Sequence, residues 1–136
     1  MILSGASAPL EEFVTLAIHA AYLLLLAVTA GLSGTWTGTI TTDEGASSPA
    51  YLKIVQDGSN ISGEVGPSEK STHPLEDAVL TGSRLAFSTH YTDPDSKEAV
   101  TWTFNMTVEG DEMHGKAEGH RGESVWYMTM KVARQK

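Results

Sequence analysis

The 136-residue sequence lacks cysteine. Without thiols the chain cannot form a disulfide framework, an iron–sulfur cluster, a thiolate zinc site or a cysteine nucleophile. Basic residues are scarce as well, since nine Lys and Arg face seventeen Asp and Glu and leave a formal net charge of −8. Proteins bind nucleic acids through Lys and Arg that neutralise phosphate charge, so we do not expect nucleic-acid binding.

Local motifs for catalysis and metal binding are also missing. Serine, histidine and aspartate occur without a nucleophile elbow or a comparable signature. The histidines of the C-terminal region lack the i, i+2 and i, i+4 spacings that bring two imidazoles together; they are His73, His90, His114 and His120. We therefore predict a protein that is not an enzyme and has no metal site. An enzyme whose site assembles only in three dimensions is the alternative.

A long uncharged segment occupies the N-terminal region. The twenty residues 13–32, which begin with Phe13 and end with Leu32, carry no formal charge. At about 1.5 Å per residue, a helix of this length crosses a bilayer core of roughly 30 Å. We therefore predict one hydrophobic helix within residues 1–33 that contacts the membrane as a transmembrane anchor.

The same segment permits a second interpretation, a secretory signal. Small residues at positions 28–30, just before Gly31, suit a signal peptidase. A signal normally opens with basic residues and has an apolar run of about 7–15 residues, whereas this N-terminus has no Lys or Arg and a longer run. These departures favour a retained anchor, with the following domain outside the cytoplasm, in the periplasm or at the cell surface. Secretion of a cleaved form is the alternative.

His19 lies within this uncharged segment. Ionisable residues in a membrane span are costly and usually face protein, water or a cofactor. One interpretation is an axial ligand to a haem or chlorophyll-type macrocycle in a larger membrane complex. The other is a neutral histidine that bonds to a neighbouring helix or is removed with a signal.

The remaining residues, 34–136, have the period of two that is typical of β-strands. In AVTWTFNMTVE, residues 99–109, the large apolar side chains share one face. Short segments of this kind are joined by Asp-Gly, Thr-Gly and Glu-Gly turns. We predict a mainly β domain, a small antiparallel up-and-down β-barrel of about eight strands. A two-sheet sandwich is the alternative.

A weak internal repeat supports the antiparallel meander. DGSNISGEVG begins at Asp57, and EGDEMHGKAEG begins at Glu109. Each copy has one glycine in its turn and a second glycine, Gly63 or Gly115, inside the following strand. A glycine inside a strand suggests a bend where a curved sheet closes on itself.

The stretches LSGTWTGTI, LKIVQDGSNISGEV and WTFNMTVEGDEMHGKAEG resemble the small lipocalin-like, calycin-type β-domains of exported bacterial proteins. More distantly, they resemble the avidins. The lipocalin-like resemblance covers nearly all of residues 34–132 and implies a barrel with a small apolar ligand inside it. An avidin would imply biotin, but the avidin pattern matches only Gly34, Thr35 and Trp36, so no biotin site is carried over.

Large aromatic side chains are the candidate ligand-binding residues. A small barrel can enclose one compact ligand, and the residues expected to line such a pocket are Trp36, Phe87, Trp102, Phe104 and Tyr127. Alternatively, these side chains fill the core of a small domain.

Two functions follow from these patterns. The first is a non-catalytic extracytoplasmic β-barrel, tethered by a single transmembrane helix, that acts as an accessory subunit beside other membrane-protein subunits. The second is a secreted or tethered lipocalin-like module that binds a small apolar ligand. An interior cavity with convergent polar groups favours the second function, and a solid core excludes it.

Overall fold

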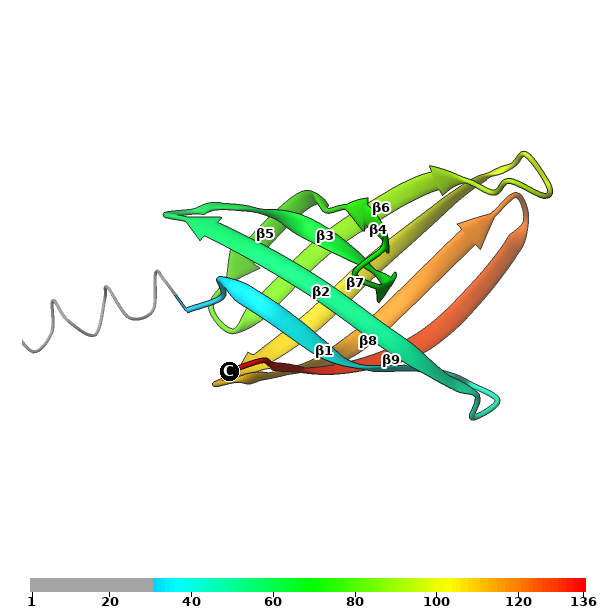
Figure 1. Ribbon diagram of the computed structural model, residues 1–136. Coiled ribbons are helices and arrows are strands. Elements are labelled where there is room, and N and C mark those ends of the chain that lie inside the picture. The colour runs from blue at the N-terminus through cyan, green and yellow to red at the C-terminus, as the bar shows by residue number, and fades with distance from the viewer. Residues whose placement is uncertain (1–30) are drawn as a thin grey trace, which may run out of the picture. The chain divides into compact units, whose positions relative to one another are not determined.

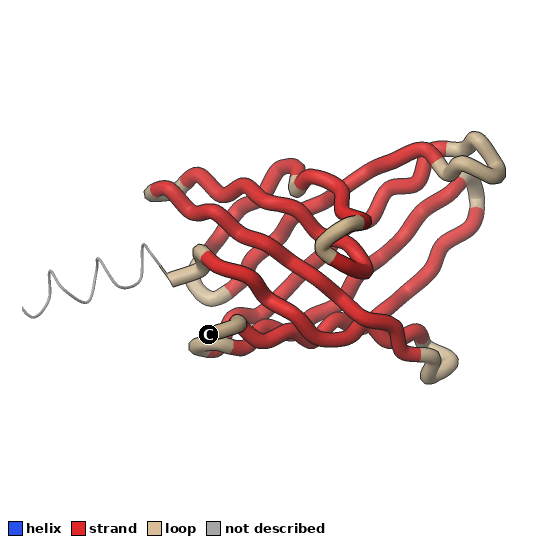
Figure 2. The backbone as a smooth tube through the Cα atoms, in the orientation of Figure 1, coloured by secondary structure: helices blue, strands red, loops and turns tan. Residues whose placement is uncertain are grey.

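The computed structural model describes residues 31–136 (Figure 1, Figure 2). His19 and most of the predicted membrane span lie outside these residues. Among the residues described, no helix is long and apolar enough to span a bilayer. Leu32, the last residue of the predicted span, belongs to the compact unit Leu32–Lys136, in which its side chain is buried.

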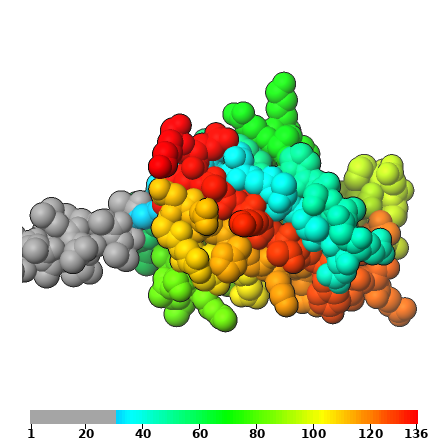
Figure 3. Space-filling view, turned by 90° about the horizontal axis from the view of Figure 1, so that it is seen from below, coloured from blue at the N-terminus to red at the C-terminus, as the bar shows by residue number. Residues whose placement is uncertain are grey.

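The described residues form one antiparallel sheet of nine strands and contain no helix. The strands are β1 (Gly34–Thr42), β2 (Ser47–Asp57), β3 (Asn60–Ser68), β4 (Ser71–Pro74), β5 (Glu76–Thr81), β6 (Arg84–Thr92), β7 (Ala99–Glu109), β8 (Glu112–Arg121) and β9 (Ser124–Arg134). Their order in the sheet is β4-β3-β2-β1-β9-β8-β7-β6-β5. The first and last long strands, β1 and β9, therefore pair, and they lie side by side in cyan and red in Figure 3. The predicted mainly β antiparallel meander is confirmed.

The strand that the sequence did not predict is β4. It is short, polar and ends in Pro74, and only Leu75 separates it from β5. β4 pairs with β3, whereas β5 pairs with β6. The chain thus changes its partner strand at Leu75 and passes from one edge of the sheet to the other.

The predicted closed barrel is not formed, because no ladder of hydrogen bonds joins the two edge strands β4 and β5. The sheet instead curls until its edges approach each other, with β3 near β5 and β4 near β6. One contact across this gap is the stacking of the His73 ring on β4 against the Tyr91 ring on β6, with ring centroids 4.3 Å apart. On the β4 side, the Leu75 N–H donates to the Gly63 carbonyl at 3.0 Å and continues the β3–β4 pairing by one residue. An irregular register between β5 and β6, where Asp77 has a φ of 51°, interrupts regular pairing at this edge.

The interior of the curled sheet is filled at one end only. We call the end with the β2–β3, β5–β6 and β7–β8 hairpins the solid end, and the opposite end, with the β1–β2, β6–β7 and β8–β9 hairpins, the open end. Because side chains alternate between the two faces of a strand, every second residue points inward. The inward side chains that fill the solid end are at most 2% exposed; they are Trp36, Leu52, Ile54, Leu85, Met106, Met113 and Val132.

Trp36 connects the start of the described chain to the last strand at the solid end. Its indole Nε1–H donates to the Leu32 carbonyl at 3.0 Å, and the Arg134 guanidinium lies 4.5 Å from the ring centroid. Arg134 Nη1 also donates to the Ser33 carbonyl at 2.9 Å, and its Nε lies 3.1 Å from an Asp111 carboxylate oxygen. These contacts tie β1, β9 and the β7–β8 turn together, so the solid end is sealed by a buried, fully bonded tryptophan.

Candidate functional site

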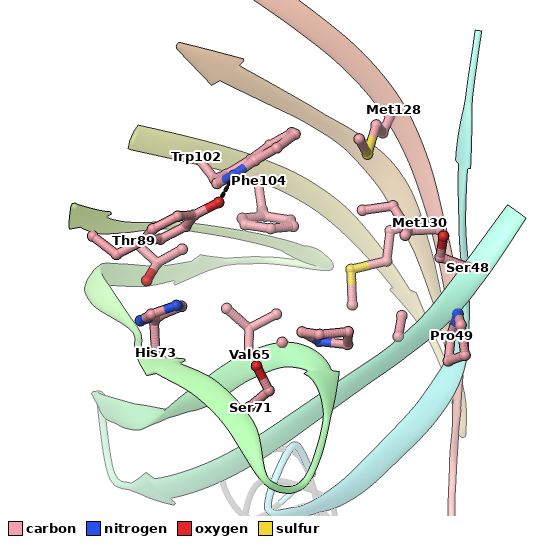
Figure 4. A pocket seen from close by; sticks show the side chains of 15 residues that line it. Ser48, Pro49, Val65, Ser71, His73, Thr89, Trp102, Phe104, Met128 and Met130 are labelled. Carbon is pink, nitrogen blue, oxygen red and sulfur yellow. Dashed lines mark hydrogen bonds between the residues drawn. The ribbon is translucent and has the colours of Figure 1, made fainter. Parts of the chain in front are cut away.

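A cavity of about 370 Å³ lies inside the curled sheet at the open end (Figure 4). Its lining comes from seven strands, β1, β2, β3, β4, β6, β7 and β9. Met130 is both a lining residue and a member of the hydrophobic core, so the cavity rests directly on the packed side chains of the solid end. Pockets for small molecules have volumes of about 300–1,000 Å³, which makes this cavity large enough for one compact ligand.

The lining is apolar and contains no Asp, Glu, Lys or Arg. Aromatic rings of Tyr91, Trp102 and Phe104 and the thioethers of Met128 and Met130 form much of it. A charged ligand would lose its hydration here without meeting an opposite charge, at a cost of several kcal/mol. Methionine side chains adapt to the shape of a ligand because they are unbranched and polarisable. The cavity therefore suits an uncharged, mainly apolar molecule.

A row of aromatic rings crosses the open end. Tyr91 stacks on His73, and the Tyr91 hydroxyl accepts a hydrogen bond from Trp102 Nε1 at 3.3 Å. Trp102 in turn stacks near Trp126, with ring centroids 6.3 Å apart. Both tryptophans are register partners of Gly119 on β8, and a Cβ at Gly119 would lie 2.7 Å from the Trp102 ring. The missing side chain of Gly119 thus provides the space that the Trp102 ring occupies.

Thr89 is a buried polar residue in the cavity wall. Its side chain is 3% exposed, and its hydroxyl Oγ1 has no hydrogen-bond partner among the described residues. A buried hydroxyl without a partner costs about 1–3 kcal/mol in proteins. Figure 4 shows Thr89 and His73 on one side of the cavity, with Met128 and Met130 on the other. The side of the cavity with Thr89 and His73 is therefore the more polar one, while on the other side Ser48 lies beside Met130.

A charged cluster lies at the rim of the open end. Arg121 lies 5.1 Å from the Trp126 ring centroid and donates to Asp93 at 2.9 Å, while Glu98 lies 3.7 Å from its Nε. The Asp93 carboxylate also accepts the backbone N–H of Asp95 at 2.9 Å. This backbone hydrogen bond, followed by the hydrogen bond from Arg121, lowers the pKa of Asp93 below its ordinary value of 3.8.

Replacing Asp93 with asparagine is expected to lower the melting temperature at pH 7 by a few degrees at most, because the ion pair is near the surface. A carboxylate whose pKa is lowered by folding stabilises the protein at every pH above the pKa that the group has in the unfolded state. This stabilisation is lost as the pH falls to the lower pKa that the group has in the folded state. The difference between wild type and Asp93→Asn should therefore shrink as the pH falls below 3.8, because the carboxylate becomes protonated first in the unfolded and then in the folded state. Thermal melts between pH 7 and pH 2.5 measure it, with Asp95→Asn as the control. A difference that is the same at pH 7 and at pH 2.5 would contradict this assignment.

The structure distributes the predicted ligand-binding residues over three places. Trp102 and Phe104 line the cavity. Trp36 lies in the solid end, and Phe87 is 2% exposed and stacks on Phe104 with ring centroids 4.6 Å apart, outside the lining. Tyr127 is 57% exposed and faces outward, since its neighbours Trp126 and Met128 face inward. It borders a second hollow of about 360 Å³, lined mostly by polar outward-facing residues.

Several lining residues were not among those predicted. Thr89 and Tyr91 share a face with Leu85 and Phe87 in the period-two pattern, so the sequence contains the signal for their orientation. His73 lies on β4, the strand that the sequence did not reveal. Its position beside Tyr91 depends on the change of partner strand at Leu75, for which no local signal exists.

Three of the four histidines in residues 31–136 lie beside a glutamate, and the four do not gather at one place. His90 contacts Glu76, and Glu109 and Glu118 lie 3.4 and 3.3 Å from His114 and His120 respectively; His73 stacks on Tyr91. Within residues 31–136 no group of three or more His, Cys, Asp or Glu is arranged to hold a metal ion. The cavity is therefore the candidate site in this part of the chain.

No protein-family model matches the sequence, and no curated protein matches it either. The function is therefore inferred from the geometry of the cavity.

Proposed function

We propose that this protein is a non-catalytic binding module that holds one small, uncharged and mainly apolar molecule in the cavity at its open end. The observation that carries this proposal is the contrast between the two ends of the sheet. Large side chains pack the solid end completely, whereas about 370 Å³ is left unfilled between Trp102, Phe104 and Met130 at the open end. A domain that needed only a core would gain stability from filling that space.

We include in this proposal the resemblance of the sequence to lipocalin-like domains. A curled antiparallel meander with one sealed end and a cavity at the other supports it, although the edges of this sheet are not joined. The resemblance implies a ligand inside the sheet, in the place where the cavity lies.

Tethering by the N-terminal segment, an extracytoplasmic location and a role as an accessory subunit stay predictions. The residues that carry them, including His19, lie outside the described part of the chain. Binding of a small molecule does not depend on whether the module is tethered or secreted.

The methionines provide a direct test of the ligand-binding proposal. With ¹³C-labelled methionine methyl groups, titration of the full-length chain with 2-methylnaphthalene should shift the signals of Met128 and Met130, which line the cavity. The signals of Met106 and Met113, which are buried in the solid end, should stay in place. We expect a dissociation constant on the order of 10–100 µM for an apolar probe of this size. Equal shifts at all four residues, or none, would contradict binding in the cavity.

Filling the cavity should abolish this binding. Ala50 lines the cavity and is 6% exposed, so Ala50→Phe places a large ring in the space that the probe needs. We expect its affinity for 2-methylnaphthalene to fall at least about tenfold, as the apolar contacts of the probe are lost. Ser71→Phe at the rim is a second variant for the case in which Ala50→Phe destabilises the fold.

Val55→Phe is the matched control. Val55 lies on the same strand but on its outer face, where it is 51% exposed. Partition of the probe into detergent or lipid is the same for both phenylalanine variants, so the difference between them reports the cavity alone. An Ala50→Phe variant that is folded and binds as tightly as Val55→Phe would refute the proposed site.

A further inference from the structure

We propose that the ligand is a flat, uncharged aromatic molecule with a hydroxyl group, and that Thr89 recognises this hydroxyl. This inference rests on the proposed ligand-binding function and adds the chemical class of the ligand and the residue that selects it. The supporting observation is that the Thr89 hydroxyl, which has no partner among the described residues, and three aromatic side chains lie together in the wall of one apolar cavity.

The polar side of the cavity has unused hydrogen-bonding capacity. Thr89 Oγ1 is buried and has no partner among the described residues. The Tyr91 hydroxyl accepts the hydrogen bond from Trp102 and still has its own proton to donate. The ring nitrogens of His73 make no hydrogen bond within residues 31–136, and its ring is held in place by stacking on Tyr91. A ligand hydroxyl both donates and accepts, which matches this combination of groups.

Thr89 is positioned to make the most selective of these contacts. It is the register partner of Trp102 and lies between Phe87 and Tyr91 on the inward face of β6. At 3% exposure its hydroxyl is shielded from bulk water, whereas Tyr91 is only half-buried. A buried polar group that a ligand leaves unpaired discriminates strongly against that ligand. Thr89 should therefore favour a ligand with a hydroxyl over an equally large apolar ligand.

The rest of the lining favours a flat ring. Tyr91, Trp102 and Phe104 offer aromatic faces and edges, which pair well with another aromatic ring in offset or tilted arrangements. Met128 and Met130 lie across from Thr89, and thioethers make favourable contacts with aromatic rings. With no acidic or basic side chain in the lining, the ring system has to be uncharged.

A pair of probes of equal size tests the inference. 2-Naphthol and 2-methylnaphthalene have the same ring system and differ in a hydroxyl or a methyl group, and 2-naphthol is uncharged at neutral pH. The shifts of the Met128 and Met130 methyl signals give a dissociation constant for each probe with the full-length chain. In Thr89→Val the constant for 2-naphthol should rise about fivefold to tenfold, as one buried hydrogen bond is lost. The constant for 2-methylnaphthalene should stay within about twofold or decrease, because valine offers a methyl group in place of the unpaired hydroxyl.

Two further variants make the result specific. Thr89→Ser keeps the hydroxyl and should retain most of the affinity for 2-naphthol. Thr101→Val removes a hydroxyl from the exposed, outward-facing side of the neighbouring strand β7 and should change neither constant. Partition of each probe into detergent is unchanged by these substitutions, so it cancels when variants are compared with the wild type.

The outcomes separate this inference from the proposed function. If both probes bind in the cavity but Thr89→Val changes their constants equally, the cavity binds ligands and the hydroxyl of Thr89 is satisfied by water alone, which refutes the inference. If neither probe shifts Met128 or Met130, the proposed ligand-binding function fails together with the inference. Selective loss of 2-naphthol affinity in Thr89→Val, with rescue in Thr89→Ser, supports both.

Discussion

Replacing Trp36 with alanine is expected to lower the free energy of unfolding by about 3–5 kcal/mol, the range for truncating a fully buried aromatic residue. Trp36 is 0% exposed, and its ring packs in the solid end of the sheet. For a small domain with a total stability of about 5–15 kcal/mol, a loss of this size leaves a large fraction of the molecules unfolded on mild heating.

The reason for the large effect is that three kinds of interaction depend on this one ring. Alanine would leave a cavity where the indole contacts the core, and the Leu32 carbonyl would lose the donor at 3.0 Å. The Arg134 guanidinium would lose the ring face beneath it, 4.5 Å from its centre. Since Arg134 also bonds Ser33, the first and last strands would lose part of their connection.

Urea denaturation followed by circular dichroism measures this effect, and Trp126→Ala is the matched control. Trp126 is half-buried at the rim of the open end, so its truncation should cost less than half as much. Trp36→Phe should cost about 1–2 kcal/mol, because it keeps most of the apolar surface and loses the hydrogen bond. A loss for Trp36→Ala no larger than that for Trp126→Ala would show that the solid end does not carry the stability of the domain.

Trp36→Phe also tests whether the two ends are independent. The cavity lining does not include Trp36, so a folded Trp36→Phe variant should keep its affinity for 2-methylnaphthalene. Stability and ligand binding would then be assigned to opposite ends of the same sheet.

The period-two pattern predicted the long strands because each has one face in the interior. In β7, Phe104 and Met106 are at most 5% exposed, whereas the intervening Asn105 is exposed. The hairpin glycines predicted the antiparallel meander in the same way, since Gly58, Gly82 and Gly110 all have φ near 62° in tight turns. Local chemistry was therefore sufficient for the hairpins between the long strands.

Local patterns missed a strand without apolar alternation and the contacts between distant segments. The four residues of β4 pair with the preceding strand β3 across a short turn, but their polar composition does not predict a strand. The open gap between β4 and β5 follows from the same change of partner strand at Leu75. The candidate site was the hardest feature to predict. Nothing in the sequence distinguishes Thr89, whose hydroxyl has no partner among the described residues, from the many other threonines in strands.

The internal repeat leads to the second large effect, at Gly63 and Gly115. These glycines occupy equivalent places in the two repeat copies, on β3 and β8, and each is paired across to a buried residue, Ile54 or Met106. A Cβ at Gly63 would overlap the Lys53 carbonyl oxygen, and a Cβ at Gly115 would overlap the Asn105 carbonyl oxygen. The neighbouring backbones therefore approach closely at both positions. Glycines inside strands permit such close approach where a sheet is strongly curved.

Gly115→Ala is expected to lower the free energy of unfolding by about 3 kcal/mol, at the upper end for overpacking, because only movement of a backbone can relieve the overlap. Gly63→Ala should cost at least as much, since Gly63 also has a φ of 146°, a conformation that L side chains rarely adopt. Urea denaturation of the full-length chain measures both values. Both variants should also bind 2-methylnaphthalene more weakly, because a sheet forced to open at β3 or β8 changes the spacing of the strands that line the cavity.

Gly110→Asn is the control from the same repeat. Gly110 lies in the β7–β8 turn with a φ of 62°, and a Cβ there would have no atom within 4 Å. Asparagine tolerates this conformation, so the cost should be below about 1 kcal/mol. If Gly115→Ala costs no more than Gly110→Asn, the strands do not approach as closely as described, and the curl that forms the cavity has a different origin. If Gly115→Ala and Gly63→Ala are both severe while Gly110→Asn is mild, close backbone packing at the two strand glycines holds the sheet in the shape that leaves room for a ligand.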